Sequence, residues 1–213
     1  MGSDPDQVCD EVGAGACGRD GCAYARRIPR PLRIQAPGAY YHITASGNTK
    51  RTLFRDDKER VDFLDLLADV VAARGWLCRS YCVLSTHYHL LVETPEPDLA
   101  AGMQSLNGRY GQRVNWRRGE KGHVFQARYH SVLVETDGHR LELHRYIALN
   151  PVRAGLVASP EDWPWSSYCG LLEFTRPPAF LDVAGALQDF AMPIAEARRR
   201  LRRFVADGLT SPK

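Results

Sequence analysis

The chain has 213 residues, and its composition, 44% hydrophobic and 25% charged, is close to that of an average globular domain. This balance excludes a wholly disordered chain, and the lack of a long apolar run excludes a membrane span. Six cysteines are too few for a disulfide scaffold of this length, and the formal net charge is only +3. The polar N-terminus shows no secretory-signal pattern, so we expect a reduced, cytoplasmic protein.

The first segment, residues 1–25, is predicted to be a disordered tail, because it is rich in Gly, Ala and Asp and has no hydrophobic period. The spacing of its three cysteines fits no common zinc site. Residues 26–33 follow as a basic arm that two prolines stiffen. We therefore expect the folded part of the chain to begin after this arm.

The rest of the chain alternates between strand-like and helix-like hydrophobic periods. The periods, with their Gly, Pro and capping signals, predict a strand over 40–45, a helix over 56–74 and two strands over 76–84 and 87–94 that a turn at 85–86 joins. A helix that begins at 99, a loop over 119–122 and a strand over 125–135 follow. The last predicted elements are a helix over 137–150 that Pro151 ends and two further helices over 181–190 and 194–205.

This order predicts an α+β fold of the ferredoxin-like, split βαβ type. Such a fold has one mostly antiparallel sheet with helices packed on one face. The helix over 137–150 is an addition to that pattern. We expect one domain over residues 26–169 and a small helical C-terminal extension over 170–213.

Basic residues gather in three clusters that are separated from the acidic ones, within residues 26–33, 109–128 and 198–203. Segregated cations with interleaved aromatic side chains are typical of surfaces that bind a phosphate backbone and stack on bases. The alternative is an ordinary solvated surface. The predicted nucleic-acid contacts from the first two clusters are Arg26, Arg27, Arg30, Arg33, Arg109, Arg113 and Arg128.

The tripeptide His87-Tyr88-His89 lies on a predicted strand. Because side chains alternate along a strand, both imidazoles point to the same face, where they can chelate one divalent ion. The alternative is a pair of partly exposed histidines without a ligand. His42, on another predicted strand, could face the same side of the sheet as these histidines, but the favoured interpretation is a structural role.

Tyr146 and Asn150 lie one helical turn apart, so they share a helix face. A phenolate is a competent nucleophile toward phosphorus, and an amide oxygen is a hard ligand suited to Mg²⁺ or Mn²⁺. The alternative is a core tyrosine and a helix-ending asparagine. Combined with the two histidines, the pair predicts a metal-assisted site for phosphoryl transfer.

Six stretches within residues 30–169 form a further, combined signal: RPLRIQAPGAYYHIT, FRDDKERVDFLDLL, THYHLLVETPEPDLAAGMQSLNGRYGQR, GHVFQARYHSVLVE, LELHRYIALNPVRAGLV and PEDWPWSSY. Together they resemble the REP-associated tyrosine transposases, the RAYT group of HUH single-strand transposases. The resemblance implies a ferredoxin-like catalytic domain. It also implies a metal-dependent enzyme that cleaves and rejoins single-stranded DNA at hairpins formed by repetitive extragenic palindromes.

The same resemblance assigns roles to the site residues. His87 and His89 are the histidines of the HUH motif, Tyr146 is the catalytic tyrosine and Asn150 is the third metal ligand, with Mg²⁺ or Mn²⁺ as the cofactor. Cleavage leaves a 5′-phosphotyrosine and a free 3′-OH. The resemblance to this group implies a monomer, although some members of the wider HUH group are dimers.

Two short segments depart from the family pattern. Ser46-Gly47-Asn48 stands where members often have Arg-Gly-Asn, and Ser85-Thr86 stands where they often have Pro-Asn. Neither change removes a predicted ligand or the nucleophile. Two alternatives remain at this point: a catalytically silent DNA-hairpin-binding protein, and an unrelated zinc hydrolase, against which the lack of a third His or Cys at suitable spacing argues.

Overall fold

The structure of the protein is a computed structural model that describes residues 35–48 and 52–210. In this part of the chain, four strands form one antiparallel sheet in the order β2-β3-β1-β4. The strands are β1 (Ala39–Ser46), β2 (Leu77–Val83), β3 (His87–Thr94) and β4 (His130–Val134). The predicted tail over 1–25 and basic arm over 26–33 lie outside the described residues.

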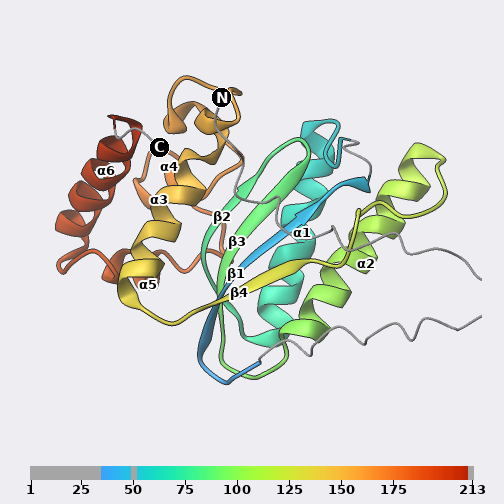
Figure 1. Ribbon diagram of the computed structural model, residues 1–213, viewed down its shortest axis with the longest axis horizontal. Helices are drawn as coiled ribbons and strands as arrows, with labels where there is room; N and C mark the ends of the chain where they lie inside the picture. Colours follow the sequence, from blue (N-terminus) through green and yellow to red (C-terminus); the bar gives the residue numbers. More distant parts are fainter. Residues whose placement is uncertain (1–34, 49–51, 211–213) are drawn as a thin grey trace, which may run out of the picture. The chain divides into compact units, whose positions relative to one another are not determined.

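Helices cover both faces of this sheet (Figure 1). On one face lie α1 (Asp57–Arg74) and α2 (Leu99–Arg118), and the main hydrophobic core joins Ile43 of β1 to Phe63 and Tyr110 of these helices. On the other face lies α3 (Asp137–Arg153), whose Ile147 packs in a second cluster with Leu91 of β3. The strand order confirms the predicted α+β, ferredoxin-like class, and α3 is the added helix.

Local signals set both ends of α1. The Asp56 side chain caps the helix by accepting a hydrogen bond from the backbone N–H of Glu59 at 2.9 Å. Gly75 closes the other end in the left-handed region, at φ 64°. The buried carboxylate of Glu59 then pairs with Arg118 at the C-terminal end of α2, which ties the two covering helices together.

Helix α3 runs past Pro151, so the prediction that it ends there is wrong. Pro151 lies in the last turn, where its missing N–H leaves a single carbonyl, that of Ile147, without its helical partner. The helix instead ends through Gly155, at φ 68°, with the N–H of Leu156 donating to the carbonyl of Pro151 at 3.0 Å. Asn150 consequently keeps a helical backbone.

Strand β4 is shorter than the predicted strand over 125–135. Its ladder with β1 begins at His130, opposite Thr44, and the preceding residues touch β1 at an isolated bridge between Gly47 and Phe125. The Phe125 ring turns toward Tyr110 of α2, with 6.2 Å between ring centroids. The apparent alternation before His130 therefore reflects packing on α2.

After α3 the chain returns to the sheet through helical elements. These are η2 (Pro160–Asp162), α4 (Tyr168–Leu171), α5 (Val183–Gln188) and α6 (Ile194–Thr210). Leu187 and Leu201 are buried in the main core, and Asp182 forms an ion pair with Arg79 of β2. None of the described helices has the length and apolar character that crossing a membrane requires.

Candidate active site

Strand β3 brings His87 and His89 to the face of the sheet that α3 covers. The two rings lie edge to face, with centroids 5.0 Å apart. His89 is only 4% exposed, whereas His87 is half-buried. The tripeptide therefore places both imidazoles at one point on this face, as the strand period predicts, while Tyr88 is buried in the main core on the opposite face.

His42 of β1 is part of this site, although the sequence analysis favours a structural role over a place on this face. Its Nε2 lies 3.1 Å from Nδ1 of His89, and the two rings stack at 5.3 Å with an angle of 13° between their planes. The Asn150 amide lies 3.0 Å from the other nitrogen of His89, Nε2. This pattern is satisfied when Nδ1–H of His89 donates to His42, which leaves the Nε2 lone pair directed at Asn150.

Helix α3 supplies the remaining two side chains from one of its faces. Asn150 is buried, at 7% exposure, and Tyr146 lies one turn before it at 39% exposure. The Tyr146 ring is 5.4 Å from the His89 ring and 5.8 Å from the His42 ring, edge to face with both. The phenol is thus open to solvent on one side and held against the histidines on the other.

The side chains around His87 and His89 fit the requirements of a divalent metal ion. Nδ1 of His89 contacts His42, and Nδ1 of His87 contacts the Thr86 hydroxyl at 3.0 Å, so both rings are oriented from that side. The Asn150 amide nitrogen faces Nε2 of His89, and turning the carboxamide over would direct its oxygen to the same place. Two imidazoles and one amide oxygen are suitable ligands for a divalent ion and leave further positions open. Across residues 35–48 and 52–210, no group of three or more His, Cys, Asp and Glu side chains could hold a metal, so this site depends on Asn150.

The histidines of this site are neutral near pH 7, as metal ligation requires. Burial, helped by the nearby His130 and His139, lowers the pKa of His42 to about 4. Burial also lowers the pKa of His89 well below its usual value, with His87 and His42 adding to the effect. The pKa of His87 is lowered by burial, and a hydrogen bond that its ring donates to the Asn150 side chain opposes this effect.

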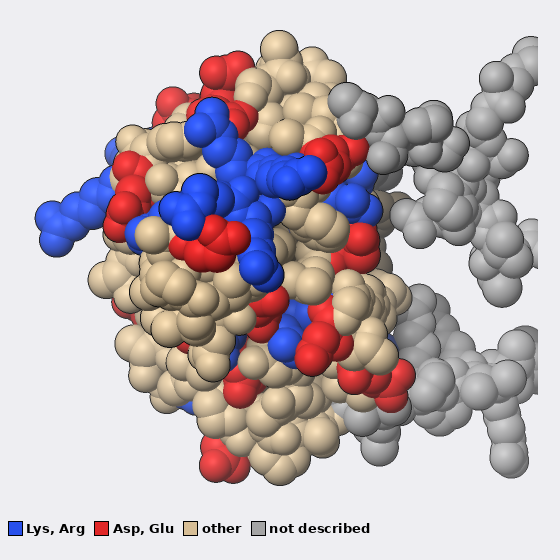
Figure 2. Space-filling view, turned by 90° about the vertical axis from the view of Figure 1, so that its left-hand side faces the viewer, with Lys and Arg blue, Asp and Glu red and all other residues tan. Residues whose placement is uncertain are grey.

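Cations surround the exposed side of Tyr146. The guanidinium of Arg153 lies over its ring, 5.6 Å from the centroid. A hollow of about 240 Å³ beside the ring is lined by Tyr146, Arg145 and Arg153 among others. The face of the molecule that carries α6 shows a concentration of Lys and Arg (Figure 2), to which the exposed arginines of α6 contribute: Arg199, Arg200, Arg202 and Arg203.

A buried set of polar contacts fixes α3 on the sheet. The Asp189 carboxylate accepts hydrogen bonds from Arg140 and His144 of α3, and the other ring nitrogen of His144 lies 2.7 Å from the Ser80 hydroxyl of β2. Serine, histidine and aspartate in a chain are also the elements of a hydrolase triad. Ser80 and His144 are each only 2% exposed, however, so substrate cannot reach the hydroxyl and the contacts are structural.

The arginines predicted to contact nucleic acid lie in different places. Arg109 and Arg113 of α2 form ion pairs with Asp69 and Asp62 of α1, at 2.7 and 3.5 Å, on the sheet face opposite the histidines. Arg128 is exposed just before β4. The four arginines of the predicted arm, Arg26, Arg27, Arg30 and Arg33, lie outside the described residues.

Comparisons with known proteins find similar sequences and a similar fold. A family model described as IS200-like transposase matches residues 35–150. A protein of Haemophilus influenzae, named as a candidate REP-associated tyrosine transposase, is 25% identical over 135 residues, which cover 55% of this chain and 77% of the relative. The solved structure of a REP-associated tyrosine transposase bound to a REP hairpin matches with a TM-score of 0.54 at 22% identity. That match covers 64% of this chain and 81% of the other.

Proposed function

The chain belongs to the IS200-like transposase family, and on that premise we propose that it cleaves and rejoins single-stranded DNA at REP-type hairpins through a phosphotyrosine on Tyr146. The observation that carries the proposal is the convergence of Tyr146 and Asn150 of α3 on His89 of β3. A nucleophile, a carboxamide and oriented imidazoles meet there. A structural core has no need of this combination on a partly exposed face.

The Tyr146 hydroxyl oxygen would attack the phosphorus of the scissile link in this mechanism. A bond forms between the phenolic oxygen and phosphorus, the bond from phosphorus to the 3′ oxygen breaks, and the products are a 5′-phosphotyrosine and a 3′-OH. The phenolic proton leaves to water, which reaches the exposed side of the ring. An attack by a 3′-OH on the phosphotyrosine reverses the step and joins strands, so no nucleotide cofactor is required.

The surroundings of Tyr146 support this chemistry. Arg153 lies where its charge offsets the negative charge on the phosphate. His87, His89 and Asn150 would hold a Mg²⁺ or Mn²⁺ ion, which when bound supplies Lewis-acid polarisation of the phosphate oxygens. The family departure at Ser85-Thr86 does not weaken this set, because the Thr86 hydroxyl itself orients His87 at 3.0 Å.

The DNA hairpin comes into the proposal from the relatives. One solved relative is described as bound to a REP hairpin, and this chain shares its fold. Arg153 lies over Tyr146, and α6, which packs on α3, carries further exposed arginines; such positive charge suits a phosphate backbone. We place the protein in the cytoplasm at the nucleoid, as a monomer, with residues 26–169 as its catalytic domain and 170–213 as an extension.

Covalent capture of DNA tests the function directly. The protein is mixed with a labelled single-stranded REP-type hairpin and Mg²⁺ or Mn²⁺, and a denaturing gel is read for a protein–DNA band. We expect the band with wild type, its loss with EDTA and its loss in Tyr146→Phe. The matched control is Tyr40→Phe, which removes the hydroxyl of another partly exposed tyrosine and should keep the band.

Two outcomes would contradict the proposal. A band of wild-type intensity from Tyr146→Phe would remove the nucleophile assignment. A hairpin that shifts on a native gel but gives no covalent band with the wild type would favour the alternative, a catalytically silent hairpin-binding protein. Light scattering of the purified protein tests whether it is a monomer.

A further inference from the structure

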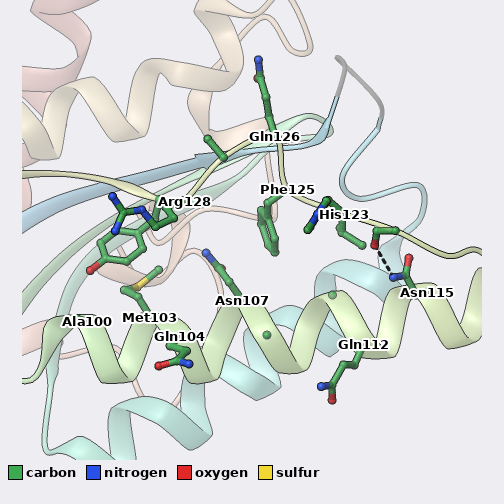
Figure 3. Close-up of a pocket in the computed structure, with 16 residues that line it drawn as sticks. Ala100, Met103, Gln104, Asn107, Gln112, Asn115, His123, Phe125, Gln126 and Arg128 are labelled. Atoms are coloured by element: carbon green, nitrogen blue, oxygen red, sulfur yellow. Dashed lines mark hydrogen bonds between the residues drawn. The ribbon is translucent and has the colours of Figure 1, made fainter. Parts of the chain in front are cut away.

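A second hollow, away from Tyr146, lies between α2 and the segment over residues 122–129 that leads into β4 (Figure 3). Its volume is about 830 Å³. That is within the range of roughly 300 to 1,000 Å³ that is typical of ligand sites. Nothing in the mechanism above uses this space.

The lining of the hollow suits a polyanion. It contains the exposed cation Arg128 and no Asp or Glu, although the chain has 25 acidic residues. The glycines at 108 and 111 lay the surface of α2 open, because a Cβ at Gly108 would meet nothing within 4 Å. Carboxamides make up most of the remaining polar lining: Gln104, Asn107, Gln112, Asn115 and Gln126.

Two of these carboxamides are fixed in opposite senses. The oxygen of Asn107 accepts a hydrogen bond from the Tyr88 hydroxyl at 2.7 Å, which leaves its NH₂ group as a donor. The NH₂ group of Asn115 donates to the carbonyl of Gly122 at 2.9 Å, which leaves its oxygen as an acceptor. The wall of the hollow therefore offers both a hydrogen-bond donor and an acceptor, as a nucleobase edge requires.

An aromatic ring completes the hollow. Phe125 extends from the 122–129 segment toward α2, and Asn107 reaches from α2 toward it (Figure 3). The Phe125 ring is backed by Tyr110, with 6.2 Å between centroids, and is itself partly exposed. A ring held in this way is a platform on which an unpaired base can stack.

The hollow connects to the active face around the edge of the sheet. Arg128 comes two residues before His130, and His130 is paired with Thr44 of β1. Thr44 also pairs with His89, so His130 faces the same side of the sheet as the histidine site. A DNA strand that leaves Tyr146 across β4 would reach Arg128 first and then the hollow.

We propose that this hollow binds the unpaired nucleotides that flank the hairpin, with bases stacked on Phe125 and a phosphate on Arg128. The inference rests on the proposed function, because it gives the single-stranded part of the same substrate its place on the protein. It assigns Asn107 and Asn115 to reading the edge of the base. The hairpin stem is bound elsewhere, on the side of Tyr146.

Filling the hollow tests the proposal without touching the active site. Gly108→Met extends a flexible apolar side chain into open space and raises helix propensity, so the fold is kept. Gly138→Met is the matched control, because Gly138 is also a helical glycine with nothing within 4 Å and does not line the hollow. The probe is a fluorescent, unstructured single-stranded oligonucleotide, compared with a blunt hairpin, and anisotropy gives each Kd.

We expect Gly108→Met to bind the oligonucleotide about tenfold more weakly and the blunt hairpin as wild type does. Gly138→Met should bind both probes normally. As a second variant, Arg128→Gln should weaken oligonucleotide binding and lower the slope of log Kd against log salt by about 1.

The outcomes separate this proposal from the function it rests on. Wild-type binding of the oligonucleotide by a folded Gly108→Met would overturn the hollow as a DNA site and leave the phosphotyrosine chemistry standing. A covalent hairpin adduct with wild type, but no oligonucleotide binding by it, would also overturn this proposal alone. Failure of wild type to bind either probe would overturn both.

Discussion

The Asp189 carboxylate lies 3.1 Å from Nε2 of His144, so a residue just after α5 is hydrogen-bonded to the helix that carries the proposed nucleophile. His144 in turn contacts the Ser80 hydroxyl of β2 at 2.7 Å. This arrangement links the C-terminal extension, α3 and the sheet through one buried imidazole. The position of Tyr146 over His89 depends on α3 being held in this way.

Replacing Asp189 tests that dependence. Asp189→Asn removes the charge that faces His144 and Arg140, and we expect a loss of about 2 kcal/mol in the free energy of unfolding. The rate of covalent adduct formation should fall at least tenfold, while the Kd for the hairpin changes little. Urea denaturation and the adduct assay measure the two effects. Asp137→Asn is the control, because its exposed carboxylate also pairs with Arg140. Equal losses in both variants would contradict a positioning role.

The Asp189 contribution also predicts a pH dependence. Burial raises the pKa of this carboxyl, but hydrogen bonds from His144 and Arg140 outweigh burial and hold the pKa below its ordinary value of 3.8. A lowered folded-state pKa stabilises the protein fully above the unfolded value and loses that effect as the pH falls through the folded value. The difference in unfolding free energy between wild type and Asp189→Asn should therefore shrink as the pH falls below about 4.

His42 provides a test of the metal site. His42→Phe keeps a ring against His89 but removes the nitrogen that fixes the His89 tautomer. We expect affinity for Mn²⁺, measured by calorimetry, to fall about 10- to 100-fold with the fold intact. His130→Gln is the control, since His130 is exposed on the same sheet face. Unchanged Mn²⁺ affinity in His42→Phe would show that His42 does not orient a ligand.

Gly155 fixes where α3 ends, one turn after Asn150. At φ 68° a Cβ is strained, so Gly155→Ala should destabilise the protein by about 1 kcal/mol. Gly138→Ala, within the same helix and with open space around its Cβ, should not destabilise it. Urea midpoints of the two variants give the comparison, and an equal effect in both would argue against the left-handed termination.

The salt dependence of hairpin binding tests the predicted DNA contacts on α2. Arg109 already has the Asp69 carboxylate as a partner at 2.7 Å. Arg153 lies over the Tyr146 ring, and within the described residues it forms no ion pair with a carboxylate. We expect Arg153→Gln to lower the slope of log Kd against log salt by about 1 and Arg109→Gln to leave it unchanged. The reverse ranking would place the hairpin at the side of α2 that faces α1, where Arg109 lies.

Much of the fold could be predicted because the deciding signals are local. The predicted strand over 87–94 coincides with β3, since the alternation of Tyr88, Leu90 and Val92 is complete there. The cap at Asp56 and the stop at Gly75 also lie within one turn of the helix end that each sets. Those contacts are satisfied within the segment itself, so sequence spacing is enough to identify them.

The errors come from segments whose partners are distant in sequence. The alternation before His130 looks like strand, but Phe125 packs on Tyr110 of α2. Pro151 predicts a helix end, but the turn that follows it is closed by Gly155, and packing of Ile147 on the sheet keeps the helix in place. Tertiary packing decided the first case. In the second, packing holds the helix, but the residue that ends it, Gly155, is a local signal four residues after the proline.

The candidate site was predictable in part. Spacing alone places His87 with His89 and Tyr146 with Asn150, and the structure brings the two pairs together. The sequence spacing could not assign His42 to the site, because only the pairing of β1 with β3 brings this histidine beside His89. The hollow beside α2 has no compact motif either, since its lining comes from a helix and a loop that meet only in the fold.

The attachment of α3 to Asp189 has a genetic consequence. Every proposed ligand and the nucleophile are encoded before codon 151, and the family match also ends at residue 150. A premature stop codon between 170 and 188 would leave all of them in the message and still remove the anion that binds Arg140 and His144. Selection for activity should therefore maintain the open reading frame well downstream of the last catalytic codon, and a truncated copy in a genome would be inert despite an intact motif.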